Sequence, residues 1–373
     1  MKITRADIIS LSVPMIPFTI STGTIDRANS VIFRVYDASG ESGMGETPVP
    51  SLSIYRDETL ENVMNQLEKV IFPAIKDREF SLPAYADDAL SSIAGNPFAK
   101  CAASTALHDL YGKQRGKTLI ELMGGTRTKL DVSKTIGICP TLEDMLAQAK
   151  QLSGEGIEWL KLKIKPGTDI AYVRALREAF PDKKLMVDGN GAYVYSQETK
   201  KLFQEMDALD LFAVEQPLQA DDYMNHAKLQ TDIRAPIALD ESVTCVSDAE
   251  QAMKLGSCKF INIKVPRVGG LTEAMRINRL CVDEGIATWV GGMMELPIGF
   301  CVNVAFATLE NCSLPTDFMD VMNNIKEYES FFRRMPFSIH HGVCTPDFRT
   351  PGIGAEINED TLMQYAVERR TLS

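Results

Sequence analysis

Five charged residues recur along the middle of the chain at nearly constant intervals. They are Lys163, Asp188, Glu215, Asp240 and Lys264, and successive members lie 24 to 27 residues apart (163, 188, 215, 240, 264). Each one ends a short apolar stretch of the kind that forms a buried strand. Carboxylates are the ligands that hard divalent cations prefer, and lysines beside them can give or take protons. The spacing therefore predicts a metal-assisted proton-transfer site, with Mg²⁺ as the cation and Mn²⁺ as the alternative.

The interval between these residues is the length of one strand–helix unit. Helical patterns separate seven candidate strands: Val132–Ile138, Glu158–Ile164, Lys184–Asp188, Phe212–Glu215, Ile237–Asp240, Phe260–Lys264 and Ala287–Val290. Seven or eight such units favour an α/β fold of the (β/α)7β TIM-barrel type, in which the carboxyl ends of the strands surround one pocket. A doubly wound open sheet is the alternative, but the chain has no early glycine-rich phosphate loop.

Side-chain parity places the charges inside the barrel. Lys161 and Lys163 alternate with Leu160 and Leu162, and Met186 shares a face with Asp188. The same alternation holds in the next three strands. Because unpaired buried charge is costly, three successive buried acids flanked by lysines are hard to explain as structure alone.

Two lysines across a metal indicate a class of reaction. A bound cation would neutralise a substrate carboxylate, so that its α-proton becomes removable and an enediolate is stabilised. A lysine must be neutral to act as the base, and we expect Lys161 and the cation to lower the pKa of Lys163. If Lys264 returns the proton from the opposite face, the result is racemisation or epimerisation. If one lysine handles all protons, the same site performs β-elimination.

The flanking segments differ from the barrel pattern. Residues 1–125 show antiparallel strands followed by helices, including one expected from Pro97 to Gly116, and predict an α+β capping domain. Residues 126–320 form the predicted barrel. Residues 321–373 are expected to pack back on the capping domain and complete it.

Composition excludes several classes of partner. The net charge is −11, with no basic tract of the kind that nucleic acid or an anionic membrane needs, and no apolar run is long enough to span a bilayer. The eight scattered cysteines indicate free thiols in a reducing compartment, and no signal-like N-terminus is present. We expect a cytoplasmic enzyme that forms a homo-oligomer and acts on a small carboxylate.

Several motifs, taken in order, resemble those of the enolase superfamily, and specifically its muconate-lactonizing subgroup. They are Lys161-Leu162-Lys163, Val187-Asp188-Gly189-Asn190-Gly191, Val214-Glu215-Gln216-Pro217, Leu239-Asp240-Glu241-Ser242 and Asn262-Ile263-Lys264. Within it, the chain resembles the N-succinylamino acid racemases and o-succinylbenzoate synthases. The resemblance implies Lys163 and Lys264 as acid and base, and Lys161 as electrostatic support. It also implies Asp188, Glu215 and Asp240 as ligands of a Mg²⁺ ion.

The resemblance extends to residues around the predicted site. It implies capping loops near Thr19–Thr24, with Thr22, and near Pro48–Ser53 that close over the substrate. It also makes Arg267 a tuning residue for Lys264, which favours a racemase. Further substrate or neighbouring contacts are expected at Asn190, Glu241, Gly292, Met293 and Glu295, although Glu295 could equally be a polar residue at the barrel end. Leu296–Phe300 departs from the subgroup and is expected to line the pocket.

Three functions remain open. The first is racemisation or epimerisation of an N-acylated amino acid or related carboxylate. The second is dehydration of the o-succinylbenzoate synthase type, or another cycloisomerase or lyase reaction of the subgroup. The third is a non-catalytic barrel, which predicts an incomplete site, whereas all five positions are filled.

Overall fold

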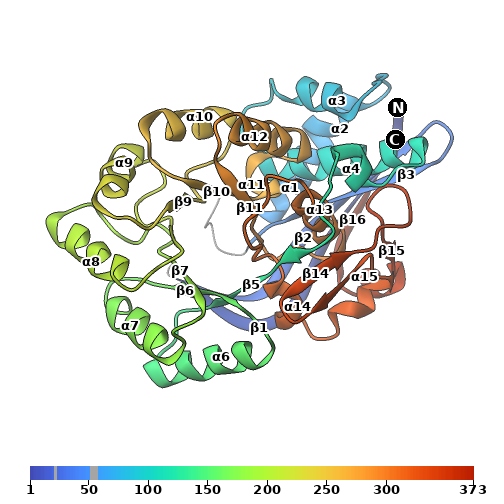
Figure 1. Cartoon of the computed structure of the whole chain (residues 1–373). Helices are drawn as coiled ribbons and strands as arrows, with labels where there is room; N and C mark the ends of the chain where they lie inside the picture. The colour runs from blue at the N-terminus through green and yellow to red at the C-terminus, as the bar shows by residue number, and fades with distance from the viewer. Residues whose placement is uncertain (21–22, 51–57) are drawn as a thin grey trace.

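The seven strands expected in the middle of the chain are all present in the computed structural model, which describes residues 1–20, 23–50 and 58–373. They pair in parallel and in chain order (Figure 1). The strands are β5 (Ser133–Ile136), β6 (Trp159–Lys163), β7 (Lys184–Asp188), β8 (Ala213–Glu215), β9 (Ile237–Leu239), β10 (Phe260–Ile263) and β11 (Ala287–Val290).

The segment around Thr316 closes this sheet into a barrel. On one side Leu314 N donates to the carbonyl oxygen of Thr288 in β11 at 3.2 Å. On the other side Thr316 N donates to Asp131 O at 2.9 Å, and Ser133 N donates to Thr316 O at 2.8 Å. The predicted TIM-type barrel is therefore confirmed, with an irregular eighth strand.

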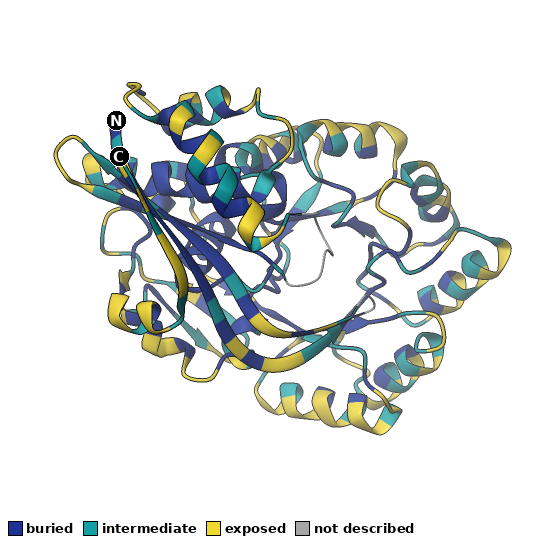
Figure 2. Ribbon diagram, turned by 180° about the vertical axis from the view of Figure 1, so that it is seen from behind, coloured by how far each residue is buried: buried dark blue, intermediate teal, exposed yellow. Residues whose placement is uncertain are grey.

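Helices cover the outside of the barrel because the strands present aliphatic side chains there. Leu160, Leu162, Val187 and Val214 are buried in one large core shared with the helices, and the outer faces of most of these helices are exposed (Figure 2). Burial of each such side chain contributes about 1.5–3 kcal/mol. The helices are α6 (Leu142–Gly154), α7 (Ile170–Ala179), α8 (Gln197–Asp207), α9 (Tyr223–Asp232), α10 (Val246–Leu255), the short α11 (Val265–Val268), α12 (Leu271–Asp283) and α13 (Pro297–Ala307).

Inside the barrel, an apolar layer lies below the charged strand ends. It contains Met186, Ala213, Ala238 and Trp289, all buried. Three of these precede the carboxylates by two residues in their strands, so they share a face with them. The inward-facing positions predicted from side-chain alternation are therefore correct. The apolar layer packs against the inner side of the charged ring.

The N-terminal unit is an antiparallel sheet covered by helices. Its strands are β1 (Ile3–Ile20), β2 (Gly23–Asp37), β3 (Ser42–Pro48) and β16 (Ala366–Leu372), in the order β16-β1-β2-β3. The helices are α1 (Leu60–Gln66), the π-helical η1 (Leu67–Ile71), α2 (Phe72–Ile75), α3 (Pro83–Leu90), α4 (Pro97–Arg115) and α5 (Leu119–Met123). Strand β3 packs so closely on α4 that a Cβ on Gly45 would lie 2.0 Å from Ala102 O. Only glycine fits there.

The C-terminal segment reaches both units. Strand β16 pairs with β1, and the two chain ends lie together (Figure 1). Strands β13 (Phe337–His340) and β14 (Val343–Pro346) instead join β4 (Leu130–Asp131) near the barrel. The remaining elements are α14 (Asp320–Asn324), η2 (Tyr328–Phe331), β12 (Phe332–Arg334), β15 (Glu356–Ile357) and α15 (Glu359–Gln364). We keep the boundaries 1–125, 126–320 and 321–373 as a proposal.

Two expectations about the whole chain can be compared with the structure. All eight cysteines are free thiols, and only Cys245 is not buried. Within the described ranges, none of the helices combines the length and the apolar character that crossing a bilayer requires.

His226 in α9 gives the fold a pH-dependent stability. It is completely buried, its Nδ1 lies 2.8 Å from Asp222 O, and its Nε2 accepts from Leu218 N at 3.3 Å. Burial is the main reason that the pKa of His226 is lowered to about 4. An unfolded histidine has a pKa of about 6.5, so the unfolded state binds the proton first as the pH falls.

The stability due to neutral His226 is therefore complete above about pH 6.5 and is lost as the pH falls towards about 4. We expect the loss to reach about 3 kcal/mol of unfolding free energy. Urea denaturation at several pH values, for the wild type and for His226→Gln, measures it as the difference between the two curves. Parallel curves would contradict this assignment.

Candidate active site

The strand ends bring the predicted ring together at one mouth of the barrel. Lys163 and Asp188 are direct partners across β6 and β7, and Asp188 and Glu215 are partners across β7 and β8. Asp240 and Lys264 directly follow β9 and β10. All five side chains are at most 8% exposed. Regular parallel pairing thus places residues about 25 positions apart in one buried layer.

Lys161 occupies the centre of the carboxylates. Its Nζ lies 2.9 Å from Asp188 Oδ2 and 2.6 Å from Glu215 Oε2. It also donates to Asp317 Oδ2 at 2.7 Å. Burial disfavours the ammonium form, but the charges of Asp188, Asp317 and Glu215 together outweigh it and raise the pKa of Lys161 well above the ordinary value. Lys161 is therefore a fixed cation, which suits electrostatic support and not proton transfer.

The two proposed acid–base lysines lie on different parts of the ring. Lys163 Nζ donates to Asp188 Oδ2 at 2.6 Å, and Lys264 Nζ donates to Asp240 Oδ2 at 2.9 Å. Strands β7, β8 and β9 separate the strands from which they project. Both lysines nevertheless line the same cavity, so both can reach one bound molecule.

This cavity lies between the barrel mouth and the capping unit. Phe18, Ile20, Ile25 and Pro50 line it from the N-terminal side. From the barrel side it is lined by Thr135, Lys161, Lys163, Lys264, Gly292, Met293, Met294, Asp317, Phe318, Asp320 and Val321. Gly292 and Met293 are therefore cavity residues. Thr22 and Ser51–Ser53 of the predicted capping loops lie outside the described residues.

Three of the other predicted residues lie behind the ring. Arg267 is fully buried, pairs with Asp240, and donates from Nε to Val243 O at 2.9 Å. Asn190 donates from its side chain to Glu241 Oε1 at 3.0 Å and from its backbone N–H to Asp188 Oδ1 at 2.9 Å. These contacts orient the carboxylates of the ring and do not reach the cavity directly.

Among the described residues, Glu295 and the segment Leu296–Phe300 are not part of the cavity lining. Glu295 is completely buried, and its Oε2 accepts from Met293 N at 2.9 Å. The expectation that Leu296–Phe300 lines the pocket is wrong, because this segment is the buried start of α13. Its apolar side chains pack into the core, where the Phe300 ring lies 5.1 Å from that of Phe318.

Two buried carboxylates that contact the ring or its supporting loop were not predicted from the sequence. Asp317 follows the irregular eighth strand, where no apolar alternation marked a strand end. Glu46 in β3 is 1% exposed and accepts hydrogen bonds from the start of α13. A signal was available for Glu46, because Leu296 before Pro297 cannot cap the helix with its own side chain.

The carboxylates at the strand ends suit a divalent cation, because they offer oxygen ligands and are buried close to one another. Burial first, and then the charge of Asp188, raises the pKa of both Glu215 and Glu241. The buried Oε2 atoms of both residues accept no well-oriented hydrogen bond from the described residues, although Lys161 lies near that of Glu215. A cation would supply the missing positive charge.

The present side-chain positions place lysine ammonium groups on carboxylate oxygens of Asp188, Glu215 and Asp240. Among the residues that the structure describes, no three carboxylate, histidine or cysteine side chains are gathered as a metal site. The site therefore fits a cation in three respects. Its ligands would be carboxylates, they follow successive strands, and the buried Oε2 atoms of Glu215 and Glu241 lack well-oriented hydrogen-bond donors among the described residues.

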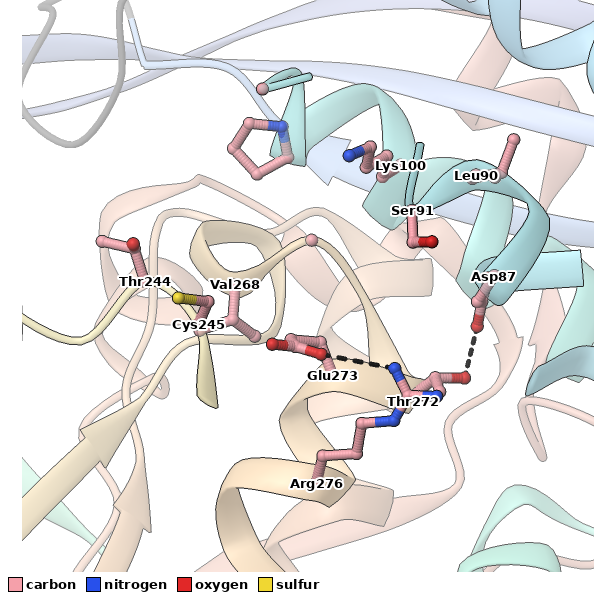
Figure 3. A pocket seen from close by; sticks show the side chains of 13 residues that line it. Asp87, Leu90, Ser91, Lys100, Thr244, Cys245, Val268, Thr272, Glu273 and Arg276 are labelled. Carbon is pink, nitrogen blue, oxygen red and sulfur yellow. Dashed lines mark hydrogen bonds and ion pairs between the residues drawn. The ribbon is translucent and has the colours of Figure 1, made fainter. Parts of the chain in front are cut away.

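A second and larger cavity lies at the junction of α3, α4 and α12 (Figure 3). Its volume is about 370 Å³, and its lining includes Asp87, Lys100, Cys245, Glu273 and Arg276. Its charged groups already have protein partners: Asp87 Oδ2 accepts from Ser104 Oγ at 2.8 Å, and Arg276 Nη1 lies 3.6 Å from Glu273 Oε2. None of the ring residues lines it, so it is separate from the chemistry.

Comparison with known proteins agrees with this geometry. Residues 3–124 match the mandelate racemase / muconate lactonizing enzyme N-terminal domain, and residues 144–361 match the enolase C-terminal domain-like family. An o-succinylbenzoate synthase from Geobacillus kaustophilus is 38% identical over 94% of this chain and 92% of its own length. An N-succinylamino acid racemase from Thermus thermophilus is 36% identical over 85% of each chain.

A solved structure shows the same architecture. A member of the enolase superfamily from Listeria innocua superposes with a TM-score of 0.93 at 31% identity, over 100% of this chain and 99% of that one. Members of the superfamily generally depend on Mg²⁺, which agrees with the acidic ring. The chain therefore belongs to the enolase superfamily, in its mandelate racemase / muconate lactonizing branch, and is an enzyme.

Proposed function

We propose that this enzyme racemises or epimerises an N-acylated amino acid, or a related carboxylate, by transferring its α-proton between two lysines. The observation that carries the proposal is the position of Lys163 and Lys264. They project from strand ends separated by three carboxylate-bearing strands, and both line one cavity. A substrate α-carbon between them would present opposite faces to the two Nζ atoms.

In each direction one lysine is neutral and the other is protonated. The neutral amine removes the α-proton, and the C–H electron pair is delocalised into the substrate carboxylate. The ammonium group opposite then delivers its proton to the other face of the same carbon. One proton is taken and one is returned, so the product differs from the substrate only in configuration.

The other charged groups of the site hold the substrate carboxylate. Lys161 remains an ammonium group among its carboxylate partners and offers a fixed positive charge. Asp188, Glu215 and Asp240 would hold a Mg²⁺ ion, with Mn²⁺ as the alternative, and this cation would neutralise the carboxylate and stabilise the enediolate charge. The apolar residues Phe18, Ile20 and Ile25 close the cavity from above and keep water from the reacting carbon.

Deuterium exchange tests the proposal directly. Each enantiomer of a panel of N-acylated amino acids is incubated with enzyme and Mg²⁺ in D₂O. We expect deuterium at the α-position of both enantiomers, measured by NMR and chiral chromatography. Absence of exchange across a broad acyl panel would remove the proposal.

A second candidate is dehydration of the o-succinylbenzoate synthase type, because relatives with that name reach 38% identity. This β-elimination needs only one proton-handling lysine beside the leaving group. Release of water from the hydroxycyclohexadiene precursor would show it. A cytoplasmic location and a homo-oligomeric state stay predictions.

A further inference from the structure

Glu46 joins the capping unit to the barrel through the start of α13. Its Oε1 accepts from Leu296 N at 2.6 Å, and its Oε2 accepts from Ile298 N at 3.0 Å and Gly299 N at 2.9 Å. Ser30 Oγ lies 3.0 Å from Oε1. Leu296 offers no side-chain cap, so a carboxylate some 250 residues earlier in the chain (46 against 296) caps this helix.

A second buried carboxyl lies against the first. Glu295 is 0% exposed, and an added Cβ on Gly299 would lie 3.0 Å from Glu295 Cγ and 3.4 Å from Glu46 Cδ. Glu295 Oε2 accepts from Met293 N, and its buried Oε1, which accepts no well-aligned hydrogen bond from the described residues, has the Asn303 side chain beside the carboxyl. Met294, which lies between Met293 and Glu295 in the chain, has a backbone φ of 68°. This value is strained for a residue other than glycine.

The surroundings of the two carboxyls disfavour two negative charges. Burial raises the pKa of Glu295 and raises that of Glu46 to about 7. Burial also raises the pKa values of Cys101, Cys301 and Tyr328 far enough that all three are neutral. Backbone N–H groups, the Asn303 side chain and the charge of Lys264 lower the pKa of Glu295 by less than burial raises it. Two negative charges in this buried site are costly, which favours one retained proton on the two carboxyls.

The hydrogen bonds indicate which carboxyl is charged. Glu46 faces three backbone N–H donors at a helix N-terminus, which favour a carboxylate. Glu295 Oε1 accepts no well-aligned hydrogen bond from the described residues, and the neighbouring Asn303 has an unpaired Oδ1 that can accept a proton held there. We propose that Glu46 and Glu295 form a one-proton pair with the charge on Glu46, and that Glu46 is a positioning residue for Lys264 through the loop Gly291–Glu295.

The loop contacts explain how Glu46 reaches the site. An added Cβ on Gly291 would lie 2.7 Å from Lys264 Cε and 2.3 Å from Asn262 Oδ1. Gly292 N donates to Asp317 Oδ1 at 3.3 Å. The backbone of this loop therefore packs directly against the Lys264 side chain. If α13 loses its cap, the loop shifts and Lys264 is no longer held in position. Lys163 lies on another part of the ring and should keep its position.

Glutamine substitutions distinguish the two carboxyls. In Glu46→Gln the amide NH₂ would face backbone N–H donors, so we expect the Ile298 and Gly299 amides to exchange hydrogen at least about tenfold faster. Glu295→Gln resembles the protonated acid and should change these rates less than about twofold. The exposed Glu41→Gln in the turn before β3 is the matched control. All are measured at pH 8 by hydrogen exchange, which does not depend on activity.

A spectroscopic measurement on the wild type covers the case in which Glu46→Gln does not fold. At pH 8 its infrared spectrum should show the C=O stretch of a protonated carboxylic acid, and this band should be missing in Glu295→Gln. Absence of the band in the wild type would overturn the pair. Faster exchange in Glu295→Gln but not in Glu46→Gln, or equal effects in both, would overturn the assignment of the charge.

The positioning role rests on the proposed two-lysine function and needs a kinetic readout. In D₂O, Glu46→Gln should slow α-proton exchange at the face served by Lys264 by about tenfold or more, and at the Lys163 face by less than about threefold. Equal slowing at both faces would overturn the positioning role. If no substrate exchanges at all, the proposed function fails, while the hydrogen-exchange result still decides the carboxyl pair.

Discussion

Replacing either Lys163 or Lys264 by glutamine is expected to abolish interconversion of the enantiomers and to leave exchange at one face intact. Each variant keeps one lysine in the cavity, and that lysine can still remove the proton from the enantiomer that faces it. General acid–base catalysis contributes about 10²–10⁴-fold, so racemisation should fall by at least that factor. Racemisation is followed by polarimetry, and exchange is followed by NMR in D₂O with each enantiomer separately.

Lys165→Gln is the matched control for these variants. Lys165 follows the same strand with the same parity as Lys163, but it is not among the residues that line the cavity, so activity should be unchanged. Loss of exchange at opposite faces in the two variants is the signature of two lysines. Full turnover after loss of one lysine would exclude racemisation by this mechanism and favour β-elimination.

Removing the cation, or one of its proposed ligands, is expected to cost as much as losing a lysine. Lewis-acid stabilisation of the carboxylate is worth several kcal/mol, and about 4 kcal/mol corresponds to ~10³-fold in rate. Chelation should therefore stop turnover, and added Mg²⁺ should restore it. Glu215→Gln and Asp188→Asn should abolish Mg²⁺ binding in calorimetry.

Thermal stability provides a readout of binding that is independent of activity. A ligand at 100 times its Kd stabilises the native state by about 2.7 kcal/mol, so Mg²⁺ should raise the Tm of the wild type. It should not raise the Tm of Glu215→Gln. Glu241→Gln should weaken binding only about 10–100-fold, because Glu241 acts through Asn190. The exposed Glu178→Gln should behave as wild type. A Mg²⁺ response that survives in Glu215→Gln would exclude this residue as a ligand.

Much of the fold and the ring could be predicted because both depend on local repetition. A strand and its covering helix need about 25 residues. The spacing of Asp188, Glu215 and Asp240 therefore equals the length of one repeating unit of the barrel. Alternation along each strand then decides that Met186 and Asp188 face inward and Val187 faces a helix. These relations hold within a few residues and require no knowledge of distant contacts.

The contacts of other residues were decided only by tertiary structure. Asp317 follows a strand without regular alternation, and it was the closing of the barrel that brought it to Lys161. Glu46 lies in an ordinary edge of the capping sheet, and only docking of that sheet places it on α13.

The same limit explains the one wrong expectation about the cavity. Leu296–Phe300 follows a strand end, but its backbone N–H groups bind Glu46 and its side chains enter the core. The sequence by itself determined the period and the parity of the strands and the residue types of the ring. The packing of distant segments decided which charges meet, because a buried carboxylate takes its donors from whatever backbone or side chain the fold places beside it.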